Sequence, residues 1–217
     1  LAAEEWGRGR RALAGSGLWN IANRASFAFG FDGPSIAVDS ACSSSATAIH
    51  LACESLRRGE CGMAVAGGVN LILHPGHHLG LVQGSMLSES GRPQPFSETA
   101  DGMVTSEGVG SLLLRPLTDA LRDGDRVLGC ILASTLASSG ARQSYLSPSA
   151  AAEKAQLQAT LRAADVEPRD ITYVEAQAMG SRLGDAAEAD ALRTVISDAA
   201  DADCRVGTMK GLVGHLE

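Results

Sequence analysis

A cysteine among small polar residues is the first feature of this sequence that could do chemistry. Cys42 lies in the run Asp39-Ser-Ala-Cys-Ser-Ser-Ser45, between an apolar segment and a stretch with helical periodicity. The positive end of a helix dipole lowers the pKa of a nearby thiol and favours the nucleophilic thiolate. Free N–H groups of a first helical turn can also hold a developing oxyanion. The run predicts an acyl-accepting nucleophile at a strand-to-helix turn, with a buried structural cysteine as the alternative.

Three polar residues farther along the chain could assist such a nucleophile. Lys210 and His215 are five residues apart in Lys210-Gly-Leu-Val-Gly-His215, and could share one pocket. A neutral imidazole donates a hydrogen bond to a carbonyl or enolate oxygen, and an ammonium group organises charge nearby. Gln177 follows a predicted strand, where the sites of α/β proteins lie. For the lysine and histidine, an ordinary surface turn is the alternative.

Short apolar strands alternate with amphipathic helices, which is the pattern of an α/β fold. Strands are predicted at residues 34–38, 63–69, 109–114, 127–135, 171–176 and 204–208. Helices are predicted at residues 43–58, 116–122, 148–164 and 185–199. Residues 74–102 are rich in Gly, Pro, Ser and His, and are predicted as a long functional loop with a short helix at best.

Composition and motifs exclude several classes of protein. The net charge of −7 argues against a nucleic-acid partner. Five cysteines without a C-x-x-C pair argue against a disulfide framework or zinc knuckle and favour the cytoplasm. No apolar run or signal segment indicates a membrane protein. His74, His77 and His78 lack a carboxylate or cysteine at ligand spacing, so no metal is expected. The absence of G-x-S-x-G and G-x-G-x-x-G elements argues against a serine hydrolase and a dinucleotide enzyme.

Taken together, these motifs resemble the ketosynthase (beta-ketoacyl synthase) domains of modular polyketide synthases. Residues 39–45 match the active-site cysteine motif of that family. The other matching segments are residues 48–60, 66–70, 91–92, 95–96, 101–102, 107–110, 210 and 214–217. The resemblance extends over essentially the whole chain. Residues 70–96 look most like assembly lines whose acyltransferase is a separate (trans) protein.

The resemblance implies a thiolase-like fold of two similar α/β halves with mixed sheets and covering helices. A family domain is roughly twice as long, so we expect a central fragment. Residues 1–96 would complete the N-terminal half with the nucleophile, and residues 97–217 would begin the C-terminal half. The sequence begins with Leu1 rather than Met, which also suggests a longer chain. A homodimer is expected, with residues 34–38 pairing across the two-fold axis.

The resemblance also implies partners. Substrates would arrive on the phosphopantetheine arm of an acyl carrier protein, with no cofactor bound directly, and neighbouring polyketide synthase domains would flank this one. Because carrier proteins are generally acidic, docking would need a local basic cluster. The candidates are Arg8, Arg10 and Arg11, or Arg57 and Arg58. A solvated charged face is the alternative for each cluster.

One motif departs from the family in a way that bears on mechanism. The second active-site motif of the family reads Glu-Ala-His-Gly-Thr-Gly-Thr, whereas this chain reads Glu175-Ala-Gln-Ala-Met-Gly-Ser181. By resemblance, Cys42, Lys210 and His215 keep their catalytic roles. Gln177 replaces the second histidine, Met179 replaces a threonine that binds the pantetheine arm, and Ser181 keeps the second hydroxyl.

An amide can donate a hydrogen bond but cannot titrate, and it reaches differently from an imidazole. We therefore expect an acyltransferase of this family that loads Cys42 and passes the acyl chain on without decarboxylative condensation. A condensing (elongating) synthase and a catalytically silent dimerisation scaffold are the alternatives.

Overall fold

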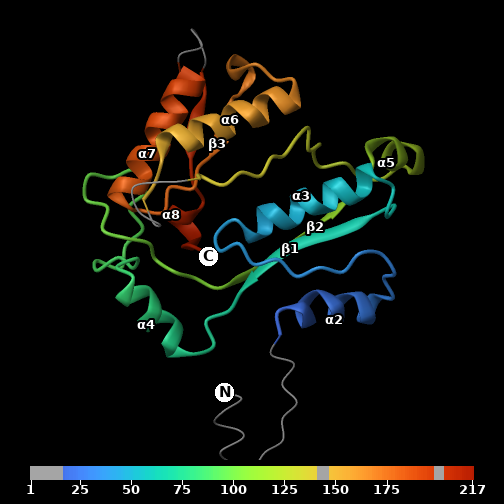
Figure 1. The fold of residues 1–217 in the computed structure, drawn as a ribbon, viewed down its shortest axis with the longest axis horizontal. Helices are drawn as coiled ribbons and strands as arrows, with labels where there is room; N and C mark the ends of the chain where they lie inside the picture. Colours follow the sequence, from blue (N-terminus) through green and yellow to red (C-terminus); the bar gives the residue numbers. More distant parts are fainter. Residues whose placement is uncertain (1–16, 141–146, 198–202) are drawn as a thin grey trace, which may run out of the picture. The chain divides into compact units, whose positions relative to one another are not determined.

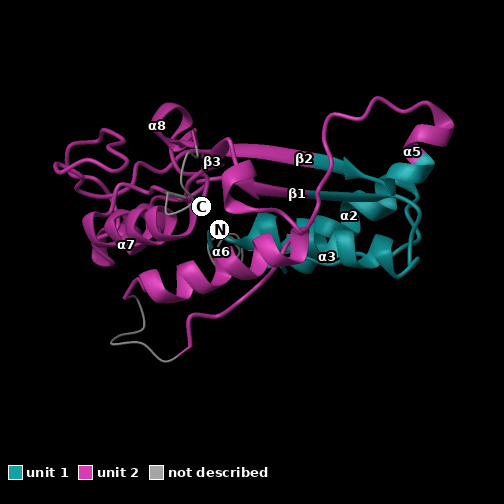
Figure 2. Ribbon diagram, turned by 90° about the horizontal axis from the view of Figure 1, so that it is seen from above, with its two compact units in different colours: residues 1–66, 112–119 teal, residues 67–111, 120–217 magenta. Residues whose placement is uncertain are grey.

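The structure is a computed structural model that describes residues 17–140, 147–197 and 203–217. The chain divides into two compact units (Figure 2). Unit 1 comprises Leu1–Ala66 and Leu112–Asp119, and unit 2 comprises Gly67–Ser111 and Ala120–Glu217. The expected basic cluster of Arg8, Arg10 and Arg11 lies outside the described residues.

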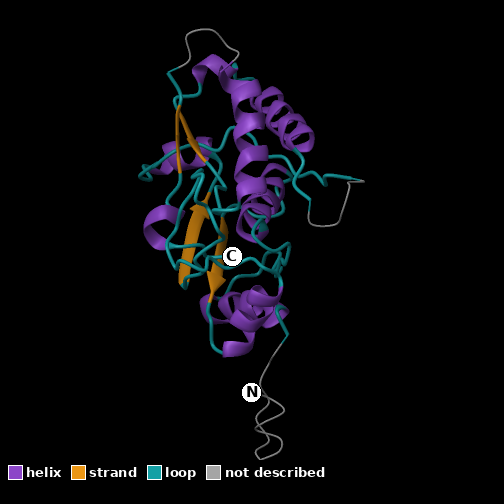
Figure 3. Cartoon of the chain, turned by 90° about the vertical axis from the view of Figure 1, so that its left-hand side faces the viewer, coloured by secondary structure: helices purple, strands orange, loops and turns teal. Residues whose placement is uncertain are grey.

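Helices and strands are mixed along the chain (Figure 3), which confirms the α/β class. Strands β1 (Ala64–Asn70) and β2 (Gly108–Leu114) pair with each other, and each runs from one unit into the other. Both confirm strands predicted from the sequence. Helix α4 (Pro75–Gln83) lies between β1 and β2 in the sequence, and helix α5 (Leu117–Asp123) follows β2.

Unit 1 contains helices α2 (Trp19–Phe29) and α3 (Ser44–Arg57). Helix α3 confirms the helix predicted after the cysteine motif. It ends at a turn in which the N–H of Gly59, whose φ is 69°, donates to the carbonyl of Leu56 at 3.1 Å. Helix α2 was not predicted. None of its residues is buried, so α2 has no apolar face packed against the rest of the described chain.

Unit 2 is built on a short parallel sheet of β3 (Tyr173–Glu175) and β4 (Arg205–Gly207). Helices α6 (Ala150–Ala164) and α7 (Arg182–Leu192) pack against each other (Figure 1), and a π-helical turn, Arg193–Ser197, continues α7. A short 3-10 helix, Pro168–Asp170, precedes β3, and α8 (Lys210–Val213) follows β4.

The core of unit 2 is aliphatic, as a chain with only 4% aromatic residues requires. Its buried members are Ala176, Ala178, Leu192, Val195 and Ile196. Leu157, Leu161, Ile171, Val174 and Cys204 pack against them. These residues come from α6, α7, its π-helical extension and the flanks of β3 and β4. The core therefore fixes the strand ends from which the candidate site is built.

Two predicted strands are wrong. Residues 34–38 and 127–135 are irregular, and their apolar side chains Ile36 and Leu132 are 60% and 64% exposed. Apolar, β-branched composition favours an extended backbone, but a strand also needs a neighbour in a ladder. The rest of the described chain provides no ladder partner for either segment. Pairing of residues 34–38 with a second copy stays a prediction.

Most other predicted elements shift by one or two residues at an end, and two predictions change by more than that. Helix α7 begins three residues before the predicted start because Ser181 caps it, accepting a hydrogen bond from Gly184 N at 3.4 Å. The predicted loop at residues 74–102 contains the nine-residue helix α4, in which Pro75 stands at the start and His74 caps the N-terminus. No helix in the described part of the chain is both long enough and apolar enough to cross a membrane.

The core of unit 2 gives a direct test of packing. Leu192→Ala should lower the free energy of unfolding of the full-length protein by about 2–5 kcal/mol, because it removes buried methyl groups and leaves a cavity. Leu183→Ala on the same helix should change it by less than about 0.5 kcal/mol, since Leu183 is 75% exposed. Urea unfolding measures both variants, and equal losses would contradict this core.

Candidate functional site

Cys42 lies in a tight turn of unit 1, two residues before α3 begins. Ala41 has a φ of 53°, which is uncommon for a residue with a Cβ atom. The N–H of Ser44 donates to the carbonyl of Ala41 at 2.8 Å, and the hydroxyl of Ser43 donates to the carbonyl of Ser40 at 2.9 Å. These bonds present an exposed thiol close to the N-terminal end of a 14-residue helix. The turn joins an irregular segment to a helix, rather than the strand that was predicted.

Three predicted residues come together in unit 2. Gln177 follows β3, Lys210 begins α8, and His215 lies just after α8 and is only 3% exposed. The Nε2 atom of His215 is 3.2 Å from the side-chain nitrogen of Gln177. The Nζ atom of Lys210 is 3.5 Å from the carbonyl of Ala176. The structure therefore brings Gln177, Lys210 and His215 into one part of unit 2, and their catalytic roles stay a prediction.

Main-chain hydrogen bonds fix the position and the tautomer of His215. Its N–H donates to the carbonyl of Val104 at 2.7 Å, and its carbonyl accepts from Ser106 N at 2.8 Å. The main-chain N–H of Glu217 donates to the imidazole Nδ1 at 2.9 Å. An imidazole nitrogen that accepts a hydrogen bond carries no proton. The proton of neutral His215 therefore resides on Nε2, which makes Nε2 a donor.

This tautomer decides how Gln177 must face the histidine. The Nε2–H of His215 and the amide NH₂ of Gln177 are both donors. Their nitrogen atoms, 3.2 Å apart, therefore cannot form a hydrogen bond with each other. The oxygen and nitrogen of a glutamine amide are assigned from their hydrogen-bond partners. Turning the amide by 180° places its oxygen where the nitrogen was. The amide oxygen of Gln177 then accepts a hydrogen bond from the Nε2–H of His215.

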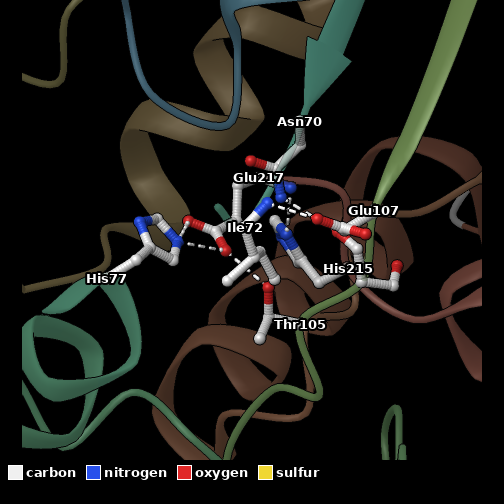
Figure 4. Close-up of polar contacts among 8 residues, drawn as sticks. Asn70, Ile72, His77, Thr105, Glu107, His215 and Glu217 are labelled. Atoms are coloured by element: carbon white, nitrogen blue, oxygen red, sulfur yellow. Dashed lines mark hydrogen bonds and ion pairs between the residues drawn. The ribbon is translucent and has the colours of Figure 1, made fainter. Parts of the chain in front are cut away.

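The carboxylate of Glu217 anchors the same loop (Figure 4). It accepts a hydrogen bond from the hydroxyl of Thr105 at 2.5 Å and lies 2.8 Å from Nε2 of His77 in α4. Burial alone would raise the pKa of Glu217, but the hydrogen bonds from Thr105 and His77 hold that pKa below its ordinary value. This contact gives His77 a role other than metal binding. Within residues 17–140, 147–197 and 203–217, no three His, Cys, Asp or Glu side chains form a metal site.

Two carboxylates of α7 hold the loop that carries Gln177. Glu188 accepts the main-chain N–H groups of Gln177 and Ala178 at 2.6 and 2.7 Å. Asp185, which is buried, accepts those of Gly180 and Ser181, each at 3.2 Å. Sequence reasoning missed both carboxylates. Their spacing of three residues at the start of the helix that follows the motif was the signal available, since such residues share a helix face.

Met179 and Ser181, predicted to bind a pantetheine arm, have different surroundings. Met179 lines a cavity of about 10 Å³ together with Pro93, Pro95 and His215, which is room for one water molecule. The hydroxyl of Ser181 caps α7, and it retains a proton to donate. Binding of a pantetheine arm by Met179 and Ser181 stays a prediction.

The second basic cluster that was considered for docking carries ion pairs. At the C-terminal end of α3, Arg57 lies 2.7 Å from Glu54, and Arg58, the residue after the helix, lies 3.6 Å from the same carboxylate. The hydrogen bond from Arg57 is the largest contribution that lowers the pKa of Glu54. Docking of an acidic partner at this cluster stays a prediction.

Electrostatics favour the neutral form of His215. Burial of the imidazole lowers its pKa below 6.5, and the positive charge of Lys210 lowers it further, while Glu217 acts in the opposite direction. Protonation would also place a new N–H on Nδ1, facing the N–H of Glu217. The site therefore presents a neutral imidazole near neutral pH.

Comparison with known families gives two matches along the chain. The family model described as "Beta-ketoacyl synthase, N-terminal domain" matches residues 4–120, and that described as "Beta-ketoacyl synthase, C-terminal domain" matches residues 128–217. The two models together span nearly the whole sequence.

Individual relatives agree with these matches. The polyketide synthase PksL of Bacillus subtilis is 42% identical over 217 residues, which are 99% of this chain and 5% of PksL. The oxazolomycin ketosynthase domain OzmH KS7 of Streptomyces albus superimposes with a TM-score of 0.92 at 41% identity. It covers 98% of this chain, which spans 37% of that structure. The ketosynthase from module 6 of the bacillaene synthase of Bacillus subtilis gives 0.90 at 34% identity, covering 94% of this chain and 37% of its own.

The lowered pKa of His215 predicts a pH dependence of stability. Below pH 6.5 the unfolded chain binds a proton at this residue that the folded chain resists, so the free energy of unfolding should fall as the pH falls through 6.5. His215→Asn cannot titrate, and its side-chain oxygen can still accept from Glu217 N. The fall, measured by urea unfolding of the full-length protein, should be smaller in this variant. Identical pH profiles would contradict the assignment.

Proposed function

The chain belongs to the beta-ketoacyl synthase family, as a ketosynthase domain of polyketide synthases with a thiolase-like fold, and we propose that it transfers acyl chains without condensing them. The observation that carries this proposal is the 3.2 Å contact between the side chains of Gln177 and His215. It supports an acyl-holding role for Cys42 and argues against efficient extension of the chain.

The retained reaction is a pair of thioester exchanges. The thiolate of Cys42 attacks the carbonyl of an acyl thioester on a carrier protein, the carbon–sulfur bond to the phosphopantetheine arm breaks, and the carrier thiol leaves with a proton. The thiol of a second carrier then reverses these steps and removes the acyl group. The exposed thiol near the start of α3 suits both exchanges, because a helix N-terminus favours a thiolate and a developing oxyanion.

Condensation makes a greater demand. The bond between the malonyl carboxylate and the neighbouring carbon breaks, carbon dioxide leaves, and the electron pair creates an enolate. The enolate carbon attacks the acyl carbonyl on Cys42, the carbon–sulfur bond to Cys42 breaks, and Cys42 is released as a thiolate. Hydrogen-bond donors must hold the negative enolate oxygen while this happens. The Nε2–H of His215 is engaged by the amide oxygen of Gln177, which leaves the neutral amide NH₂ as the donor on this side. Loss of one such donor costs on the order of a hundredfold to a thousandfold in rate.

The proposal extends to partners by membership of the family. Acyl carrier proteins deliver and receive the chain, neighbouring synthase domains flank this one, and the domain works as a homodimer without a bound cofactor. Met179 lines the same small cavity as His215, and in this proposal its side chain affects how the pantetheine arm enters. The segment at residues 70–96 supports an assembly line that is served by a separate acyltransferase.

Transacylation without condensation can be measured directly. The full-length protein should be incubated with an acyl carrier thioester and then with malonyl carrier protein. Intact-mass analysis should detect acyl-Cys42, while the β-ketoacyl product should form at least about a hundredfold more slowly than in a ketosynthase with both histidines. Cys42→Ala should abolish loading. Efficient condensation by the unsubstituted protein would overturn the proposal, and failure of every acyl donor to load Cys42 would instead favour a scaffold.

A pair of substitutions isolates the cause. Gln177→His restores a second imidazole and should raise malonyl decarboxylation, and combining it with Met179→Thr should raise it further by reopening the space beside His215. Met179→Thr alone is the matched control, because it leaves Gln177 in place and should not restore decarboxylation. Restoration by the control alone would show that access of the arm, and not the donor, limits condensation.

A further inference from the structure

The loop that carries Gln177 is held by its main chain rather than by its side chain. Glu188 of α7 places one carboxylate oxygen 2.6 Å from Gln177 N and the other 2.7 Å from Ala178 N. Two charge-assisted hydrogen bonds to consecutive N–H groups fix the plane of the peptide between them. Since the Cα atom of Gln177 lies in that segment, the same bonds determine the direction in which its side chain leaves the backbone.

The backbone at this point is strained. Ala178 has a φ of 33°, in the region that favours glycine because a Cβ atom is crowded there. The residue is also buried, with 2% of its surface exposed. Such a conformation persists only where surrounding contacts enforce it. The carboxylate of Glu188 is the contact made to the N–H of Ala178 itself. The hydrogen bonds from Gln177 N and Ala178 N to Glu188, called the clamp below, therefore stabilise the strained backbone at Ala178.

We propose that Glu188 is a positioning residue, which holds the strained Gln177–Ala178 backbone so that Gln177 reaches the Nε2–H of His215. This inference rests on the proposed function, because it explains how the amide is kept against the imidazole. The hydrogen bonds of Glu188 go to the main chain of the loop, so it acts on the amide side chain through the backbone.

The neighbourhood of Glu188 provides a matched control. Glu153 of α6 faces it across the α6–α7 contact, and burial, together with the negative charge of Glu188, raises the pKa of Glu153. Glu153→Gln makes the same chemical change beside the clamp without removing an acceptor from the loop. Asp185 holds a different part of the loop, at Gly180 and Ser181, and stays intact in every variant.

A double-mutant cycle tests the clamp in the full-length protein. Glu188→Gln keeps one acceptor oxygen but presents an NH₂ group to the other N–H, and should lower the folding equilibrium constant about tenfold. In an Ala178→Gly background the loss should shrink to about threefold, because glycine adopts positive φ without strain. Glu153→Gln should show no such coupling to Ala178→Gly. Additive losses for Glu188→Gln and Ala178→Gly would overturn the proposal.

A spectroscopic readout separates positioning from stability. In protein with ¹⁵N-labelled histidine, the Nε2–H proton of His215 should give a downfield signal from its hydrogen bond to Gln177. Glu188→Gln should shift or abolish that signal in the folded protein, Ala178→Gly should partly restore it, and Glu153→Gln should leave it unchanged. An unchanged signal in folded Glu188→Gln would overturn the proposal. Condensation by the unsubstituted protein would overturn the proposed function while leaving this signal and the cycle as they are.

Discussion

One main-chain hydrogen bond, from Glu217 N to the imidazole Nδ1 of His215, governs the chemistry of the unit 2 cluster. It makes Nδ1 an acceptor and leaves the proton of the neutral ring on Nε2. Everything that Gln177 does to the histidine follows from this assignment, because a ring with the opposite tautomer would offer a lone pair at the same place. Thr105 and His77 hold the side chain of Glu217, and so they also help to fix the main-chain N–H that Glu217 donates to the imidazole.

The cluster combines two kinds of support that respond differently to change. The His215 ring depends on a loop fastened to residues 104–106 by main-chain bonds, while the Gln177 loop depends on carboxylates from α7. The aliphatic core beneath β3 and α7 holds the second support in place. Packing in the core of unit 2 is thus connected to the donor pattern of the site through a few hydrogen bonds.

Much of the fold and of the candidate site could be predicted where the residues concerned lie close together in the sequence. The run around Cys42, the pair Lys210 and His215, and Gln177 after a strand all lie in short motifs. Helical periodicity predicted α3, and short apolar segments predicted the four strands of the described residues. The failed strands at residues 34–38 and 127–135 show the limit, since composition indicates an extended chain but cannot supply a ladder partner. Contacts between distant segments, such as those of Glu217 with Thr105 and His77, likewise could not be predicted from a linear pattern.

The way in which Glu188 holds the loop has a genetic consequence. Its hydrogen bonds go to main-chain N–H groups, which every residue except proline offers, so the side chain at Gln177 can be exchanged without rebuilding the support. Glutamine and histidine codons differ only in their third base. A single nucleotide change therefore separates a loop whose amide occupies the donor of His215 from one that presents a second imidazole, while the hydrogen bonds that hold the loop stay the same.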